Sequence, residues 1–495
     1  MSAARASWLR LTPLALLALA ACSAVRDTWR PEGDGGWTAA QRRQAVSSLA
    51  PVAGVVDPLA AATPVPTAIV YDLRAALAEA TRANRPLQIA EAQVGIARQR
   101  ALEARGLLLP TTTAQARYTA YSDVQSTEAH VPANALGPGF PPKDATFPVV
   151  LTDSSAATVQ AQVLVPVDLS GELRQTLAAA QAGYRGEEAR RWATALEQDL
   201  EVTRAYFDRL QAQRLREVSE QTIALYQRQL RDAQDRFDAG RLTKNEVLEV
   251  QVVLRNAEQS KRQIDVSVER TRWAFNQAIG VAIDAPTDVV DIRTRPDLPP
   301  VDETLRQAET KNPVLTALFE HQRQLEAQLS ALERSRFPHF EGGGAMNYSS
   351  SDLFQPNQIG SGFVGFRWDL GTDTQREERI GAARLAAEQN RVELEAELRR
   401  LEQALRATQL AAEERLTALD TAEVAVGQAE ENLRIRQQQF GAGRAQTRDV
   451  LDAQRLLTEQ RAVLATALYE AQTRRAELQQ LMGEPFDALL ADRKE

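Results

Sequence analysis

The sequence predicts a mainly α-helical chain with two structural repeats, in which long coiled-coil helices are interrupted by four β-strands. The first observation is a duplicated turn, since Phe237-Asp238-Ala239-Gly240-Arg241 reappears as Phe440-Gly441-Ala442-Gly443-Arg444. The second is a pair of long runs with helical spacing of apolar residues, and the third is a set of short segments in which polar and apolar residues alternate. The repeat comes first because it decides how the whole chain is divided.

The start of the chain is predicted to be an export signal. Two arginines precede an apolar stretch from Leu14 to Ala21, and the only cysteine, Cys22, follows it. A positive start, a short apolar run and small residues before the cleavage point are typical of a signal peptide, here residues 1–21. A single cysteine allows no internal disulfide. Residues 22–68, rich in Pro, Gly and Ala, are expected to form a tether.

Each half of the chain is predicted to be one repeat. The first covers residues 69–283 and the second residues 301–485, with a linker at 284–300 and a tail at 486–495. Corresponding residues keep their order in the two halves: Leu77, Ala80, Asn84, Leu87 and Pro110 match Leu305, Ala308, Asn312, Leu315 and Pro338. The distance from this proline to the next shared motif is longer in the first half. That half therefore carries an insertion.

Two long runs are expected to be helices. The run from Glu172 to Phe237 contains no proline, and the run from Asp373 to Phe440 repeats leucine at steps of three and four. Such spacing keeps an apolar seam on one side of a helix and favours coiled-coil packing. At a rise of 1.5 Å per residue each run would extend roughly 100 Å. Taken alone, these seams also fit an ordinary structural coiled coil.

Four segments alternate with period two and are predicted to be strands, at about 111–122, 156–167, 339–349 and 360–369. About ten residues with one polar face suit a tilted transmembrane strand whose other face meets lipid. A small barrel already needs about eight strands, and open sheet edges are not tolerated in lipid. The chain must therefore oligomerise, with three copies supplying about twelve strands, or keep its strands in water as two hairpins packed on helices.

Composition argues against several function classes. A formal charge of −8 and a pI near 5.4 disfavour nucleic acid as a partner. His130, His321 and His339 lie far apart and lack metal-ligand spacing, and we find no glycine-rich phosphate loop. We therefore predict no enzymatic activity, no metal and no cofactor.

The ordered motifs resemble the outer membrane efflux protein family, the TolC-like exit ducts of bacterial export systems. The resemblance rests on Asn84-Arg85-Pro86 and Asn312-Pro313, the strand exits Val165-Pro166-Val167-Asp168-Leu169 and Phe366-Arg367-Trp368-Asp369-Leu370, and the duplicated turns. Leu19-Ala20-Ala21-Cys22 resembles a bacterial lipobox, which points to the lipoprotein branch with an acylated Cys22. A plain secretory signal cut nearby, leaving a free thiol, is the alternative.

The resemblance implies a homotrimer with a shared 12-stranded β-barrel in the outer membrane, continued by an α-helical barrel across the periplasm. Residues 122–155 would form an extended loop on the cell exterior. The implied function is a passive exit duct that receives substrates from a periplasmic adaptor and an inner-membrane pump, in contact with outer membrane lipids. The alternative is a periplasmic coiled-coil lipoprotein that acts as a scaffold or adaptor.

The duplicated turns would be the periplasmic tips of the helices. Gly240 and Gly443 are expected to adopt the left-handed conformation that ends a helix, and Thr243 or Thr447 to cap the next one. By resemblance, the tips contact the adaptor through Phe237, Gly240, Arg241, Leu242, Thr243, Phe440, Gly443, Arg444 and Thr447. Opposite charges beside them, Asp235 and Asp238 in the first turn and Arg444, Arg448 and Asp449 in the second, suggest a periplasmic gate in which ion pairs hold adjacent helix pairs together.

Overall fold

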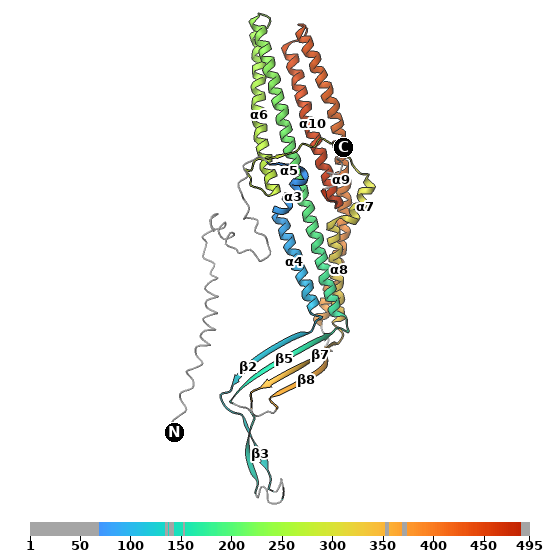
Figure 1. Cartoon of the computed structure of the whole chain (residues 1–495). Helices are drawn as coiled ribbons and strands as arrows, with labels where there is room; N and C mark the ends of the chain where they lie inside the picture. Colours follow the sequence, from blue (N-terminus) through green and yellow to red (C-terminus); the bar gives the residue numbers. More distant parts are fainter. Residues whose placement is uncertain are drawn as a thin grey trace, which may run out of the picture. The chain divides into compact units, whose positions relative to one another are not determined.

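The computed structural model describes residues 69–133, 137, 143–151, 154–351, 356–368 and 374–486, all within one compact unit, Val65–Glu495. The expected signal peptide, the lipidation site Cys22 and the tether lie outside the described residues, as does the tail beyond residue 486. Helices make up most of the described chain, and the strands fall between them in both halves (Figure 1). The predicted mainly helical, two-repeat fold is confirmed.

The two halves repeat the same order of helices. In sequence they are α3 (Leu73–Ala83), α4 (Arg85–Gly106), α5 (Glu172–Asp238) and α6 (Lys244–Ile279), then α7 (Val301–Lys311), α8 (Pro313–Arg334), α9 (Thr374–Gly441) and α10 (Thr447–Met482). The long helices α5 and α9 have 67 and 68 residues. Helices α4 and α6 pack along successive lengths of α5, and α8 and α10 pack along successive lengths of α9, while both α8 and α10 also pack on α5.

An asparagine separates the short first helix from the second in each half. The Asn84 side chain accepts a hydrogen bond from the Leu87 N–H at 3.0 Å, and Asn312 accepts from the Leu315 N–H at 3.2 Å. A proline within the first two positions of α4 and α8 suits a helix start, since its missing N–H has no partner there anyway. Each half therefore begins with two consecutive helices rather than one.

A mixed layer, here called the waist, surrounds the middle of the long helices. It consists of α3, α7 and the parallel pair β1 (Ile69–Tyr71) and β6 (Thr287–Val289), so part of the expected linker is a strand. Its largest core joins aromatic residues from both halves: Tyr71, Tyr206, Phe207, Phe275, Tyr469 and Phe486. Tyr206 donates a hydrogen bond to the Val290 carbonyl at 2.6 Å, which fixes the segment after β6 onto α5.

The Tyr469 hydroxyl ties α10 to the same layer by donating to Asp291 at 2.7 Å. Burial and this bond raise the pKa of Tyr469 above its ordinary value. Burial alone would raise the pKa of Asp291, but hydrogen bonds from Arg293 and Tyr469 outweigh it and lower that pKa. The waist is thus held by both apolar packing and a partly buried polar contact.

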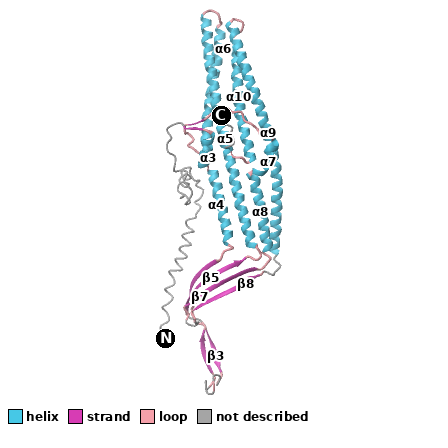
Figure 2. Cartoon of the chain, turned by 45° about the vertical axis from the view of Figure 1, so that its right-hand side comes forward, coloured by secondary structure: helices cyan, strands magenta, loops and turns pink. Residues whose placement is uncertain are grey.

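Four strands form an antiparallel sheet in the order β2 (Thr111–Ala120), β5 (Ser155–Val167), β7 (His339–Ser349) and β8 (Gln358–Arg367). Figure 2 shows this sheet at one end of the long helices, with the α5–α6 and α9–α10 turns at the other end. The region 122–155, expected to be an extended loop, differs from that expectation because it contains a hairpin of β3 (Ser126–Val131) and β4 (Ala145–Val150). The proline-rich composition of the region hid its alternating pattern.

Candidate functional site

The four-stranded sheet has one apolar and one polar face. In the observed register Ala116 lies opposite Val159, Val159 opposite Tyr348, and Gly342 opposite Val364, so their side chains share one face. That face also carries Ala114, Tyr118, Ala161, Val163, Val165, Val167, Phe340, Met346 and Phe366. The other face is mostly polar, with Thr113, Gln115, Arg117, Thr158, Gln160, Gln162, Glu341, Asn347 and Arg367, and it also carries Leu164, Ile359 and Phe363. The two faces of the sheet therefore differ in polarity.

The apolar face is exposed in the isolated chain. Tyr118 is 72% exposed and Val364 is 89% exposed, and the rings of Phe340 and Phe366 lie side by side with centroids 5.9 Å apart. A large uncovered apolar patch marks a contact with another protein or with a membrane. Among the described residues, no helix combines the length and apolar character required to cross a bilayer.

Both edges of this sheet are open within the described chain, because β2 pairs only with β5 and β8 only with β7. An open edge exposes a row of unpaired N–H and C=O groups. Inside the sheet, Gly343 allows close packing: a Cβ there would meet the Val163 carbonyl oxygen and the Phe363 ring. The sheet is therefore well packed internally and incomplete at its two sides.

The two helical tips share one backbone design. Gly240 and Gly443 have φ of 68° and 71°, which confirms the predicted left-handed conformation. The N–H of the next residue donates five residues back in each tip, from Arg241 to Arg236 and from Arg444 to Gln439, both at 2.8 Å. These bonds satisfy carbonyls at the end of α5 and α9 in the Schellman arrangement.

Thr243 and Thr447 were predicted to cap α6 and α10, the helices that follow the two tips, and the prediction is correct for Thr243 only. Thr243 caps α6 in a capping box with Glu246. In the second tip the cap of α10 is Gln446, whose N–H donates to Asp449 at 2.9 Å, so the prediction of Thr447 as the cap was wrong. Gln446 occupies the repeat position of Thr243, and Thr447 lies one residue further along, inside the helix.

The predicted contact residues differ in exposure between the tips. Phe237 is 39% exposed, whereas Phe440 is 8% exposed and packs with Leu433, Val450 and Leu457. Gly240, Arg241, Thr243, Gly443 and Arg444 are exposed, Leu242 is half-buried and Thr447 is buried. In this conformation Phe440 and Thr447 support the second tip from inside the chain. Contact of these residues with another protein stays a prediction.

Arg236 links the two tips, and the sequence did not single it out. Its guanidinium carbon lies 4.3 Å from the centroid of the Phe440 ring, and its Nη1 donates to the Phe440 carbonyl at 3.3 Å. The Thr447 hydroxyl adds a long contact of 3.5 Å to Glu246 on α6. The corresponding residue in the other tip is Gln439, so the link is formed once per chain. An arginine next to a helix-ending turn is common, so the sequence alone did not indicate that Arg236 contacts the other tip.

The charges predicted to form a gate are mostly engaged locally or exposed. Asp449 accepts from the Gln446 N–H, and Arg448 lies 3.9 Å from Asp452 on the same helix. Asp235 and Asp238 are exposed at the end of α5. The gate role of Asp235, Asp238, Arg448 and Asp449 stays a prediction.

Helices α6 and α9 also carry exposed apolar seams. Helix α6 packs on α5 and α9 packs on α10, which leaves α6 and α9 at the two sides of the helices near the tips (Figure 1). On α6, Val252, Val266 and Trp273 are exposed and recur at multiples of seven residues. On α9, Leu410 and Val424 are exposed and lie two heptads apart. Such a spacing is typical of a helix that packs against another helix.

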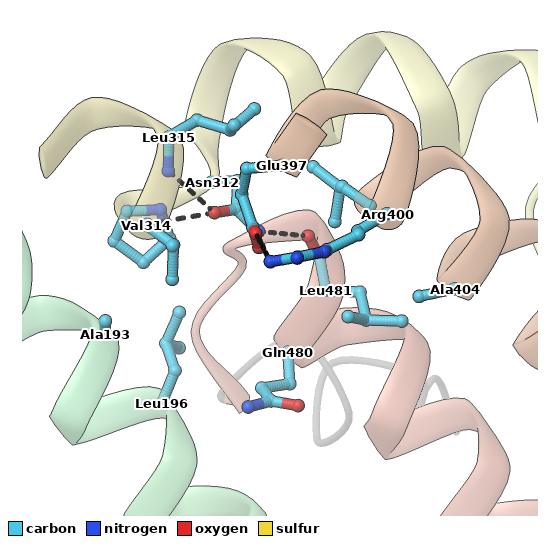
Figure 3. Close-up of a pocket in the computed structure, with 12 residues that line it drawn as sticks. Ala193, Leu196, Asn312, Val314, Leu315, Glu397, Arg400, Ala404, Gln480 and Leu481 are labelled. Carbon is cyan, nitrogen blue, oxygen red and sulfur yellow. Dashed lines mark hydrogen bonds and ion pairs between the residues drawn. The ribbon is translucent and has the colours of Figure 1, made fainter. Parts of the chain in front are cut away.

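A cavity of about 190 Å³ lies between α5, the start of α8, α9 and the end of α10 (Figure 3). Asn312 projects into it, and its amide nitrogen donates to the Leu481 carbonyl at 2.9 Å while its oxygen accepts from Val314 and Leu315. Glu397 and Arg400 form an ion pair of 3.3 Å on the α9 side. Because Asn312 bonds to the chain through both amide atoms, it anchors α8 to α10.

Comparison with known families identifies the fold just described. The model of the family described as outer membrane efflux protein matches residues 76–281 and 304–484. This chain belongs to the outer membrane efflux protein family. The two matched blocks correspond to the two repeats, and family membership confirms the predicted outer membrane location. A search of curated proteins returned no match.

Solved structures of outer membrane channels share the fold of this family member. The outer membrane protein VceC from Vibrio cholerae is 17% identical with a TM-score of 0.67, and the match covers 84% of this chain and 96% of VceC. The CmeC channel of Campylobacter jejuni is 14% identical with a TM-score of 0.67, covering 85% and 88%. The open state of the Neisseria gonorrhoeae MtrE channel is 20% identical with a TM-score of 0.63, covering 83% and 89%.

Proposed function

We propose that this chain is the passive exit duct of a tripartite efflux system, and that it works as a homotrimer. The observation that carries the proposal is the four-stranded sheet with one exposed apolar face and two open edges. The apolar face suits contact with lipid, whereas the two open edges are not tolerated there and must be closed by further strands. Three copies bring about twelve strands, enough to surround a polar lumen, since about eight strands leave room only for side chains.

The strand directions support closure between copies. Neighbouring strands in the sheet are all antiparallel, so β2 and β8 run in opposite directions. A β8 edge can therefore join the β2 edge of the next copy as one more antiparallel pair. If Thr113 lies opposite Gly365 in that seam, the apolar face continues around the outside and the polar face lines the inside.

The exposed helix seams support the same assembly. Val252, Val266 and Trp273 on α6 and Leu410 and Val424 on α9 lie at opposite sides of the chain's own helices. A head-to-tail contact between α6 of one copy and α9 of the next buries both seams and closes a ring by rotation. The helices then form a tunnel that continues the barrel.

In this trimer the tips form the periplasmic entrance and contact an adaptor protein, which connects the duct to an inner-membrane pump. The exposed tip residues Phe237, Arg241 and Arg444 are the surface offered to the adaptor. An acyl group on Cys22 anchors each copy in the outer membrane. The duct performs no chemistry, so the energy for transport comes from the pump.

Paired cysteines in the proposed seam test the trimer. Thr113→Cys combined with Gly365→Cys places one thiol on each edge, and a Cβ at position 365 meets no heavy atom within 4 Å. Mild oxidation in outer membrane fractions is expected to give covalent trimers on non-reducing gels, with related pairs at 363 and 367 scanning the register. Ala114→Cys with Gly365→Cys places the thiols on opposite faces and serves as the matched control. A monomer with both edges unlinked in every register would overturn the proposal.

Single-channel recording in planar bilayers tests conduction by the same protein. The trimer is expected to conduct, and Asp449→Ala, a predicted gate residue, tests whether the charges at the entrance limit the current. Unchanged conductance in Asp449→Ala removes that residue from the gate while leaving the duct intact.

A further inference from the structure

The passage between the four-stranded sheet and the long helices, here called the joint, brings together two titratable side chains from different repeats. The joint covers residues 168–172, where β5 leads into α5, and residues 335–339, where α8 leads into β7 (Figure 2). Glu172 lies in the first turn of α5, and His339 is the first residue of β7. Glu172 Oε2 lies 3.4 Å from His339 Nδ1. The pair therefore connects a helix of the first repeat to a strand of the second.

One oxygen of the Glu172 carboxylate lacks a hydrogen-bond donor. Its Oε2 is buried and accepts no hydrogen bond from the residues that the structure describes. A neutral imidazole carries hydrogen on only one of its two nitrogens, whereas a protonated imidazole donates from both. Protonation of His339 therefore secures a hydrogen on Nδ1, next to the unsatisfied oxygen, and turns the contact into a charge-assisted hydrogen bond.

Further charged groups lie around the pair, and they come from each element that meets at the joint: Asp168 after β5, Arg174 on α5, Arg334 on α8, Glu341 on β7, Arg367 on β8 and Arg376 on α9. Asp168 is engaged by Arg174, whose Nε donates to it at 3.1 Å. Arg367 lies opposite His339 in the sheet and disfavours a positive imidazole, whereas Glu341, on the same side of β7, favours it. Glu172 is the carboxylate that directly contacts His339.

The surroundings of Glu172 make the charge on His339 matter. Burial raises the pKa of the Glu172 carboxyl and nearby Asp168 adds to the rise, while the charges of His339 and Arg376 lower it. Ionisation of Glu172 therefore costs stability as the pH rises through its raised pKa, and a positive His339 offsets part of that cost. Histidine is the side chain whose charge ordinarily changes between about pH 5 and 8. Both groups therefore favour a tighter joint in acid.

We propose that Glu172 and His339 form a pH-sensitive clamp, which tightens the joint when the pH falls from about 8 to about 5.5. In acid the clamp holds the start of α5 against the start of β7 and so fixes the direction in which the sheet meets the helices. At higher pH His339 is neutral, Glu172 loses its cationic partner on β7, and the joint loosens. The contact lies within one chain, so the clamp does not depend on the proposed trimer or on the proposed function.

Hydrogen exchange of backbone amides in the full chain, in detergent, tests the clamp. His339→Asn removes the imidazole and is expected to speed exchange in the first two turns of α5 several-fold over the parent at about pH 5.5, with a ratio near one at about pH 8. Because variant and parent are compared at the same pH, the intrinsic pH dependence of exchange cancels. His130→Asn, on exposed β3, is the matched control and is expected to leave the ratio near one at both values. An equal ratio for His339→Asn at the two pH values would overturn the clamp.

Glu172→Gln tests the other half of the pair without altering β7. It keeps the size of the side chain and removes its charge, so exchange at the start of α5 is expected to be faster than in the parent at about pH 5.5 and no faster at about pH 8. In the double variant, His339→Asn is expected to add nothing in acid, because the imidazolium has already lost its carboxylate. An undiminished effect of His339→Asn in the Glu172→Gln background would assign the acid response to another partner, such as Glu341, and overturn the pair.

Discussion

The two helical tips have the same backbone and different surroundings. Both end a long helix at a left-handed glycine, yet Phe237 of the first tip is exposed and Phe440 of the second is buried beneath Arg236. The second tip is therefore stabilised by the first within one chain, while the outward side of the first tip has no equivalent cover among the described residues. A duplicated motif can thus keep its backbone geometry while one copy is covered within the chain and the other is left exposed.

The largest expected difference between the tips comes from their phenylalanines. Phe440→Ala removes a buried aromatic side chain and is expected to cost about 3–5 kcal/mol of local stability. Phe237→Ala is expected to stay within about 0.5 kcal/mol, as for an exposed site. Hydrogen exchange of backbone amides near the ends of α9 and α5 in the full chain measures both. Similar loss of protection in the two variants would contradict the comparison.

The two tip glycines are expected to respond alike. Gly240→Ala and Gly443→Ala both place a side chain in the left-handed region, at a cost of about 1–2 kcal/mol, and neither Cβ meets a heavy atom within 4 Å. Gly483→Ala is the contrast, because its Cβ would also meet the Lys311 carbonyl. Thermal unfolding should rank Gly483→Ala as the most damaging. Unequal shifts for the two tip variants would show that their backbones differ in strain.

The helix caps give a smaller difference. Thr243→Ala removes the side-chain acceptor of the capping box and is expected to destabilise the start of α6 by about 1 kcal/mol. Thr447→Ala deletes no cap, because Gln446 holds that position. Amide exchange at the first turn of α6 and of α10 compares them. Faster exchange at α10 in Thr447→Ala would restore the original cap assignment.

A still smaller loss of stability than from the cap is expected for Arg236→Gln, which gives the first tip the residue found in the second. It removes a cation–π contact worth about 0.5–1 kcal/mol at a partly exposed site. Because this contact ties neighbouring hairpins at the proposed entrance, the conductance of the trimer is expected to rise. Arg241→Gln, on the exposed turn, is the control. No change in conductance would limit Arg236 to a structural role.

The sequence predicted the helices and the four main strands well because their signals are periodic and repeated. Asn84 and Asn312 were singled out as matching motifs of the two repeats, and each caps the helix that follows. The contact of Arg236 with Phe440 could not be predicted, because it joins residues from different hairpins. The hairpin at Phe147 was missed because prolines nearby outweighed a short alternating pattern.

The open edges β2 and β8 also have a consequence for biogenesis. Before it assembles with other copies, a newly exported copy would expose two unpaired strand edges and the apolar face of its sheet to water. The sheet is therefore the part of a newly exported copy that is most prone to wrong pairing before the copies assemble. Maturation of this protein is therefore expected to depend on its own concentration as much as on its sequence.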